Sequence, residues 1–390
     1  MQSKKMKRIY LDHAATTKLD KKVKEKIVEA MEIFGNPSSM YQEGRLAKSI
    51  LFQQRKNIAD ILNCLPEEII FTGSGTESDN LSIFGVVRNF KKGHIITTKI
   101  EHHAVLHSME QLEKEGFEIT YLNIEKDGII DIEEFKKALR KDTILVSIMY
   151  ANNEIGTIQP IKEISEILKQ QNHEIIFHTD ACQAINYLDI NVKNLGVDLM
   201  TFSGSKIYGP KGIGVLYKKS KIKISPIILG GGQEMNLRSG TESLIMITGI
   251  GEALKITEEK KEKEVKRLTK LRDYFMEQLE SKIEKLHING DRKKRLPNNI
   301  HISIEGIEGE ALLLMLDEFG ISCATGSACS SDNLDISHVL VALNIPVEYR
   351  HGSLRFTLGR ETTKEDLDKT AEILQGVVER LRSFSSVKLR

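Results

Sequence analysis

Short apolar runs alternate with amphipathic stretches over the first half of the chain. The apolar runs are rich in β-branched residues, and turns of small or polar residues separate them from the amphipathic stretches. The runs lie at 68–72, 94–98, 118–122, 143–150, 174–178, 199–202 and 213–217. Helical periodicity is found between them at 77–89, 105–115, 132–140 and 161–170. This alternation predicts an α/β fold, with a mostly parallel sheet covered by helices on both faces.

Different patterns precede and follow this region. Asp20 is placed to cap a helix that ends before Gly35-Asn36-Pro37, and a longer helix is expected over 43–62. A long amphipathic helix follows residue 254, and after it come strands at 299–304, 321–323 and 353–358 with helices at 310–319, 338–343 and 364–382. We therefore expect a large domain at 14–255. A smaller α+β domain is expected at 256–390, together with residues 1–13.

Composition is that of an ordinary globular protein. Of 390 residues, 40% are hydrophobic and 28% are charged, and the net charge is +1. This balance gives no reason to expect nucleic acid or an anionic membrane as a partner. The basic start MQSKKMKR is followed by no apolar stretch, and no run is long enough to span a bilayer, so neither a signal peptide nor a membrane segment is expected.

The four cysteines form no CxxC pair, so we expect no metal site of that spacing. So few thiols in a chain of this length are typical of a reducing compartment, and we expect the protein to be cytoplasmic.

Chemically useful residues follow the predicted strands. Ligands of such sheets bind outside the carboxyl ends of the strands, so these residues are expected to converge. Gly75 and Thr76, in GSGTESDN, begin a helix whose free N–H groups suit a phosphate, although an ordinary strand-to-helix turn explains them equally well. The residues that follow the later strands are His102, Asn153, Asp180, Gln183 and Lys206.

Lys206 is the centre of this set. It follows a buried strand and the turn Ser203-Gly204-Ser205, where desolvation can make an amine nucleophilic enough to form a Schiff base with a carbonyl cofactor. An ordinary loop lysine explains that stretch equally well. Asp180 favours the Schiff-base interpretation of Lys206 over the loop lysine. Pyridoxal phosphate needs a lysine for its aldehyde, an acid for its pyridine nitrogen and donors for its phosphate. The combined set predicts a pyridoxal phosphate site.

The rest of the chain adds a thiol, a guanidinium and a loop. Cys329 lies in TGSACSSDNLDIS, whose small and polar residues would leave a thiol accessible, whereas Cys64 and Cys323 sit among apolar neighbours. Arg355 interrupts an apolar strand, either as a structural ion pair or as a clamp for a substrate carboxylate. The glycine-rich loop 228–243 carries Thr241 and offers donors for a phosphate, in its own site or in that of a neighbouring subunit.

A succession of motifs resembles the cysteine desulfurases, which are fold type I pyridoxal phosphate enzymes of the class V aminotransferase group. The resemblance runs from about residue 9 to about residue 370, and its motifs are LDHAATT, GNPSS, GSGTES, EHHAV, NNEIGT, DACQ, SGSKIYGPKG, GGGQE, LRSGT, TGSACSS and LRFTLGR. The resemblance implies that Lys206 holds the cofactor, that Asp180 and Gln183 bind its ring nitrogen and hydroxyl, and that His102 stacks on the ring. The implied phosphate ligands are Gly75, Thr76, Ser203 and, from the other subunit of a homodimer, Thr241. The hydroxyl of Ser205 can also donate to the phosphate.

The resemblance also implies a reaction. Asn153 and Arg355 would hold the carboxylate of L-cysteine, and Cys329 would attack its sulfur, leaving L-alanine and a persulfide. The sulfur would pass to an acceptor protein, either an iron–sulfur scaffold or a tRNA-thiolation enzyme. Three features depart from the family, and one of them is Tyr41, which stands after GNPSS where His is common. Ser205 stands where members usually carry His, and the chain ends at Arg390 without the extension that some members use to dock a scaffold.

Two alternatives remain at this point. A related class V enzyme, such as a selenocysteine lyase or an aminotransferase, would use Lys206 without an exposed thiol. A non-catalytic scaffold of the sulfur system would be compatible with Ser205.

Overall fold

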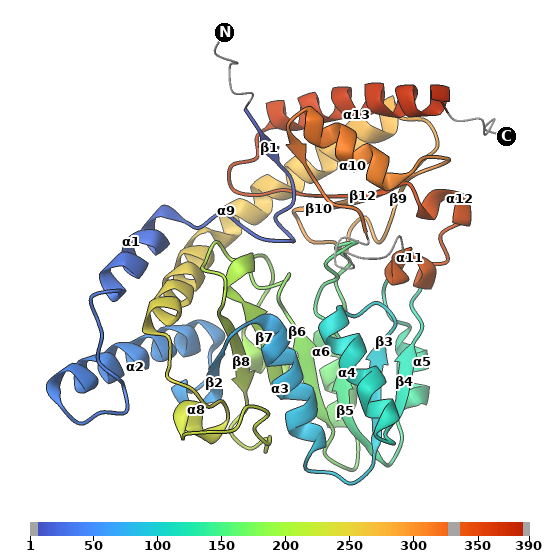
Figure 1. Cartoon of the computed structure of the whole chain (residues 1–390). Coiled ribbons are helices and arrows are strands. Elements are labelled where there is room, and N and C mark those ends of the chain that lie inside the picture. The colour runs from blue at the N-terminus through green and yellow to red at the C-terminus, as the bar shows by residue number, and fades with distance from the viewer. Residues whose placement is uncertain (1–6, 327–335, 385–390) are drawn as a thin grey trace.

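The computed structural model describes residues 7–326 and 336–384. Among these residues a seven-stranded sheet organises the larger part of the molecule (Figure 1). Its strands, in spatial order, are β2 (Ile69–Thr72), β8 (Gly214–Lys218), β7 (Leu199–Ser203), β6 (Ile176–Asp180), β5 (Thr143–Ser147), β3 (His94–Thr98) and β4 (Glu118–Leu122). Only β8 runs against its neighbours. The predicted mostly parallel sheet is confirmed.

Alternate residues of each strand enter different cores, as the two-residue period of a strand requires. In β2, Phe71 joins a core with helices α1, α2, α6 and α9, whereas Ile70 joins one with α3 and α4. Helices therefore cover both faces of the sheet, as predicted. The helices of this region are α1 (Lys21–Ala30), α2 (Gln42–Leu62), η1 (Pro66–Glu68), α3 (Gly75–Val87), α4 (His103–Lys114), α5 (Ile132–Ala138), α6 (Ile161–Lys169), α7 (Val192–Leu195), η2 (Gly204–Lys206) and α8 (Gln233–Asn236).

The largest differences between predicted and observed strand ends are in β5 and β6, near the site. β5 ends at Ser147 instead of residue 150, because the N–H of Met149 donates to the buried carboxylate of Glu101 at 3.0 Å rather than to a strand. β6 begins later than predicted and continues to Asp180, which pairs with Thr201 of β7. Asp180 is therefore the last residue of a strand, and its backbone is held by the sheet.

The C-terminal part forms a smaller unit above the large sheet in Figure 1. Strands β12 (Ser353–Thr357), β10 (Asn299–Ile304) and β9 (Leu286–Ile288) make an antiparallel sheet, and β1 (Ile9–Tyr10) pairs with β11 (Ile321–Ser322). The helices are α10 (Gly309–Glu318), α11 (His338–Ala342), α12 (Val347–Arg350) and α13 (Lys364–Phe384). Ile9 and Leu11 belong to the core of this unit, so the N-terminal segment packs with the C-terminal part.

Helix α9 (Leu244–Lys282) joins the two units and passes from one to the other in Figure 1. Its first half, including Leu254, packs in the core of the large sheet, whereas Leu268 and Phe275 pack in the core of the small unit. The boundary expected after residue 255 thus lies within a continuous helix. We propose that two domains nevertheless meet there, because the hydrophobic core changes along the helix. No described helix combines the length and apolarity needed to cross a bilayer.

Two fully buried phenylalanines test this division. Phe275 packs edge-to-face on Phe356 in the small unit, with ring centroids 5.4 Å apart, and Phe135 lies in the core of the large sheet. We expect each Phe→Ala change to cost about 3–5 kcal/mol, the usual range for such a cavity. In hydrogen exchange, Phe275→Ala should accelerate β10 and β12, and Phe135→Ala should accelerate β3 and β5. Identical patterns for both variants would contradict the two-domain proposal.

Candidate active site

A cavity of about 340 Å³ opens at the carboxyl ends of the central strands. All predicted site residues within the described chain line it, except Thr241: they are Gly75, Thr76, His102, Asn153, Asp180, Gln183, Ser203, Ser205, Lys206 and Arg355. Thr241 is exposed on the loop after α8 and does not line the cavity of its own chain. Cys329 lies outside the described residues. The structure thus brings together residues far apart in sequence, while their individual roles stay predictions.

The start of α3 forms a narrow anion-binding corner of the cavity. Ser74 caps the helix, because its Oγ accepts a hydrogen bond from the N–H of Glu77 at 3.1 Å. A Cβ on Gly75 would lie 2.9 Å from Sγ of Cys182 and 3.5 Å from Cβ of Ser203, so only glycine fits without displacing a neighbour. The N-terminus of a 13-residue helix attracts anions through its free N–H groups and its dipole. A phosphate therefore fits this corner.

Two buried carboxyl groups, those of Asp79 and Asp180, line another wall of the cavity. Burial raises the pKa of Asp79 well above its usual value, and the negative charge of Asp180 raises it further. Oδ1 of Asp79 has no hydrogen-bond partner among the described residues and lies 3.5 Å from Nε2 of His178. Burial lowers the pKa of His178 to about 4, so this imidazole is neutral at physiological pH. A cationic ring nitrogen beside Asp180 would relieve the repulsion between the two acids.

Lys206 enters the cavity from the turn that follows β7. Its Nζ donates a hydrogen bond to the carbonyl of Ala15, in the N-terminal segment. The nearby Gln183 also binds this segment, since its Nε2 donates to the carbonyl of Ala14 at 3.0 Å. The lysine amine and the Gln183 amide thus share one wall with residues that precede the first helix.

His102 has a structural role that the sequence did not reveal. Its Nδ1 accepts a hydrogen bond from the N–H of Ala104 at 3.1 Å and so caps α4. Burial lowers the pKa of His102, the charge of Asp180 raises it, and the charge of Lys206 lowers it. The lowered pKa favours a neutral imidazole, and the cap places its remaining hydrogen on Nε2.

Arg355 forms a structural ion pair, one of the two interpretations considered for it, and its role as a substrate clamp stays a prediction. Its guanidinium forms an ion pair with Asp12, with 2.8 Å between Nη2 and Oδ1, and Nη1 donates to the carbonyl of Asn153 at 3.1 Å. Its Nε is buried without a hydrogen-bond partner among the described residues, although an unsatisfied buried donor is costly. Because Arg355 lines the cavity, a ligand carboxylate or a water could satisfy this donor. Asp12 is a partner that the sequence did not indicate.

Asp79 and Cys182 also line the cavity, although the sequence had not singled them out for the site. A signal for Asp79 existed: Gly75, Ser78, Asp79 and Ser82 form a small, polar stripe on α3 that is buried. An acid on a buried helical stripe needs a partner nearby.

The described cysteines are poorly suited to nucleophilic chemistry. All three are free, and burial raises the pKa of Cys64 and Cys323 to about 12, which makes these thiols unreactive. Among the described residues, no His, Cys, Asp or Glu cluster is arranged to hold a metal ion.

An amine, a buried acid, an imidazole and a helix N-terminus in one cavity define an α/β enzyme with a site suited to pyridoxal phosphate. The chain belongs to the aminotransferase class-V family, whose sequence profile matches residues 9–370, and it is similar throughout to the cysteine desulfurases of that family. Enzymes of this family use pyridoxal phosphate, and so does this protein.

Similar proteins match nearly the whole chain. The cysteine desulfurase IscS of Dictyoglomus turgidum is 51% identical, over 98% of each chain. That of Methanosarcina thermophila is 49% identical, over 97% of this chain and 94% of its own. A solved NifS-like protein is 35% identical with a TM-score of 0.91, covering 96% of this chain and 100% of its own. The NifS-like protein from Rickettsia africae is 33% identical with a TM-score of 0.86, over 96% and 100% of the two chains.

Two glycine substitutions test the anion corner. Gly75→Ala should weaken pyridoxal phosphate binding by about tenfold or more, because displacing a packed neighbour costs about 1–3 kcal/mol. Gly376→Ala in α13 is the control, since its Cβ would meet nothing within 4 Å. The measurement is a titration of each apo-protein with the cofactor, followed by absorbance. Equal affinities for both variants and the unmodified protein would remove the start of α3 from the site.

Proposed function

We propose that the protein is a cysteine desulfurase that converts L-cysteine to L-alanine and retains the sulfur as a persulfide on Cys329. The observation that carries the proposal is that Lys206, Asp180 and Arg355 line one cavity. The amine and the acid suit the cofactor, and the guanidinium suits the carboxylate of an amino acid. Full-length similarity to cysteine desulfurases supports L-cysteine as that amino acid.

The residues of the cavity divide between cofactor and substrate. Lys206 would bind the cofactor aldehyde, and Asp180 its ring nitrogen. His102 would lie against the ring, and Gln183 would approach its hydroxyl. The phosphate ligands in this proposal are Gly75, Thr76, Ser203, Ser205 and, from a second subunit, Thr241. When bound, the cofactor supplies an electron sink that makes the α-proton of the amino acid removable.

Asn153 and Arg355 would bind the substrate carboxylate. Nη1 of Arg355 already donates to the Asn153 carbonyl, so the two residues are in direct contact. A solved neighbour described as SspA in complex with cysteine is 33% identical with a TM-score of 0.79, over 90% of this chain and 98% of its own. That ligand supports cysteine as the substrate of this protein too.

The chain's own groups move one proton and one sulfur atom. Nζ of Lys206 would take the α-proton, and His102, neutral and capped on Nδ1, would offer Nε2–H beside it. The Cys329 thiolate would attack the substrate sulfur, so that an S–S bond forms as the C–S bond breaks. The electron pair of the broken bond remains with the β-carbon, which takes up a proton, and return of a proton to the α-carbon then gives alanine. No outside oxidant is required, because sulfur is oxidised as carbon is reduced.

Ser205 lies beside the anion corner, at a position where members of the family usually carry a histidine. This chain therefore has a hydroxyl there in place of a possible cation. Oγ of Ser203 and Oγ of Ser205 lie 3.1 Å apart, so two hydroxyls face the same part of the cavity. Hydroxyls can donate to a phosphate, and the helix N-terminus supplies positive potential. The loss of a cation at position 205 is therefore compatible with an active enzyme, and a purely non-catalytic scaffold is the weaker alternative.

We further propose that the protein is a homodimer, that it passes sulfur to an acceptor protein, and that it works in the cytoplasm, where its thiols stay reduced. The acceptor would be an iron–sulfur scaffold or a tRNA-thiolation enzyme. Large apolar side chains are exposed on α2, on the link between α1 and α2, and on and beside α8, which lie on one side of the molecule (Figure 1): Met31, Phe34, Met40, Tyr41, Leu46, Phe52, Leu229 and Met235. Exposed apolar surface of this kind is typical of a subunit interface.

Substitution of single cysteines tests the persulfide step. Cys329→Ala should form neither a protein persulfide nor sulfide above about 1% of the unmodified rate, since removal of a nucleophile typically costs several orders of magnitude. The variant should still bind the cofactor and show its visible absorption. Cys64→Ala, which removes a thiol that burial makes unreactive, should retain full activity. Full sulfide release by Cys329→Ala would favour the related class V lyase or aminotransferase.

Charge placed on the exposed apolar surface tests the dimer. The side chain of Phe34 is 83% exposed, and Phe34→Glu should convert a dimer into a monomer with reduced cofactor affinity. Leu314→Glu on α10 is the control, because Leu314 is 68% exposed on the small unit. Light scattering after size-exclusion chromatography gives the masses. A monomeric unmodified protein would contradict the homodimer, and with it the role of Thr241.

A further inference from the structure

The backbone just after Lys206 adopts a conformation that side-chain-bearing residues rarely take. Tyr208 has a φ of 61°, in the left-handed region. Such a conformation persists only where the surrounding contacts hold it, and it is often found next to functional residues. Tyr208 is two residues from the lysine proposed to bind the cofactor, so its contacts act on the turn that carries this lysine.

Hydrogen bonds from several elements hold the backbone on both sides of Lys206. Nδ2 of Asn186 donates to the Lys206 carbonyl at 2.6 Å, and the N–H of Thr17 donates to the Ser205 carbonyl at 2.9 Å. The N–H of Tyr208 donates to Oγ1 of Thr17 at 2.7 Å. All of these partners belong to the large unit. They fix the backbone of the turn but leave the tyrosine side chain to other contacts.

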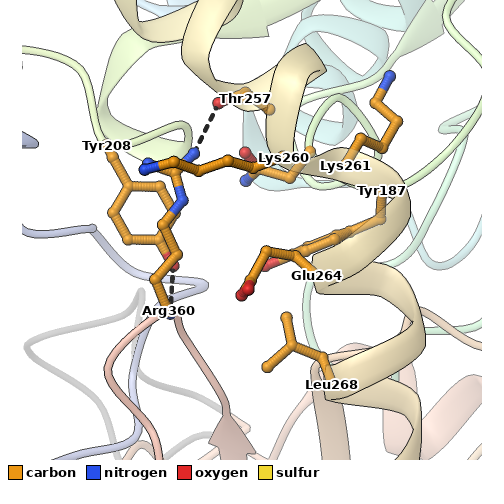
Figure 2. A pocket seen from close by; sticks show the side chains of 9 residues that line it. Tyr187, Tyr208, Thr257, Lys260, Lys261, Glu264, Leu268 and Arg360 are labelled. Carbon is orange, nitrogen blue, oxygen red and sulfur yellow. Dashed lines mark hydrogen bonds between the residues drawn. The ribbon is translucent and has the colours of Figure 1, made fainter.

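Arg360, from the small unit, supplies those contacts. Its guanidinium carbon lies 3.9 Å from the centroid of the Tyr208 ring, a close cation–π contact, and its backbone N–H donates to the tyrosine Oη at 3.0 Å. Nη1 of Arg360 also donates to Oδ2 of Asp20 at 3.0 Å, and Nη2 to Oγ1 of Thr257 at 3.1 Å. Figure 2 shows the guanidinium between the Tyr208 ring and Thr257 of α9. The cavity that remains among these side chains measures only about 10 Å³.

Arg360 lies five residues after Arg355, on the segment that leaves β12. This segment is held to the large unit at both positions, since Arg355 binds the Asn153 carbonyl and Arg360 binds Tyr208. Arg267 of α9 fixes the chain between them, because its Nη2 donates to the Gly359 carbonyl at 2.9 Å. One short segment therefore carries both the proposed substrate clamp and the contact with the lysine turn.

We propose that Arg360 is a positioning residue that, through Tyr208, sets the place of Lys206 relative to the substrate clamp Arg355. The inference rests on the proposed function for the reaction it serves. Loss of Arg360 would let the Tyr208 turn relax and displace the lysine amine from the α-carbon of a substrate held by Arg355. Substrate binding, which depends on Arg355 itself, would change little.

Steady-state kinetics with L-cysteine on the cofactor-bound protein give the first test. Arg360→Ala should lower kcat at least tenfold and change KM less than threefold. Arg360→Lys keeps a cation near the ring but cannot bind Asp20 and Thr257 together. Its kcat should therefore lie between that of Arg360→Ala and that of the unmodified enzyme. Lys260→Ala is the matched control. Lys260 lines the same pocket and its Nζ lies 3.6 Å from Oδ2 of Asp20, but the cation over the Tyr208 ring is the guanidinium of Arg360. Lys260→Ala should match the unmodified enzyme.

A pH titration of the visible absorption of the cofactor-bound protein gives a second readout that needs no turnover. Its midpoint depends on where the lysine nitrogen lies relative to charges such as Asp180, so Arg360→Ala should shift it by about half a pH unit or more. Tyr208→Leu should shift it similarly, and the double variant should go no further, because both changes remove one contact. A lowered melting temperature with unchanged kcat, KM and midpoint would show a purely structural role and overturn the inference.

Replacement variants and the activity of the unmodified enzyme separate the possible results of these tests. If Arg360→Ala does not fold, Arg360→Lys and Tyr208→Phe replace it, and additive effects of these two changes on the midpoint would count against the coupling. If the unmodified enzyme released no sulfide from L-cysteine, the proposed function would be wrong. The absorbance titration would still decide whether Arg360 positions Lys206.

Discussion

The site depends on two acids that are buried in one cavity wall. Asp79 and Asp180 are almost inaccessible to solvent, and burial keeps the neighbouring His178 neutral, so this imidazole contributes no charge to offset them. A carboxylate in such surroundings stabilises a cation placed beside it strongly, since water does not screen the interaction. The fold supplies the surroundings: Asp180 ends a central strand, and α3 brings Asp79 against it. The protein is thereby suited to keeping a ring nitrogen protonated.

The junction between the two units depends on other buried groups. Burial raises the pKa of Glu101 to about 8 and that of Glu154 to about 7. Glu101 accepts the N–H of Met149, and Glu154 accepts the hydroxyl of Ser337 at 2.5 Å. Nε2 of His338 lies 3.0 Å from the Glu101 carbonyl. The contacts of Ser337 and His338, together with those of Arg355 and Arg360, join the small unit to the large one around the cavity.

The cysteines illustrate how the surroundings of a thiol change its pKa and therefore its reactivity. Desolvation raises the pKa of all three described thiols, including Cys182, which lines the cavity and is further opposed by Asp180. None is therefore suited to nucleophilic attack near neutral pH. Cys329 is set apart in sequence by its small and polar neighbours. A thiol that has to donate its sulfur to another protein must avoid such desolvation.

Local sequence determined the strands and helices, and with them the edge of the sheet where the site lies. Apolar periodicity and turn residues act over a few positions, so the predicted runs agree with the observed β3 and β4 and nearly with α2 and α13. The topology of a parallel sheet then brings residues such as Asp180 and Lys206 to one edge. Only the tertiary structure decided the partners across long separations: Asp12 with Arg355, Asp79 with His178, and Arg360 with Tyr208. These contacts depend on how two hydrophobic cores pack along one continuous helix, which no local pattern encodes.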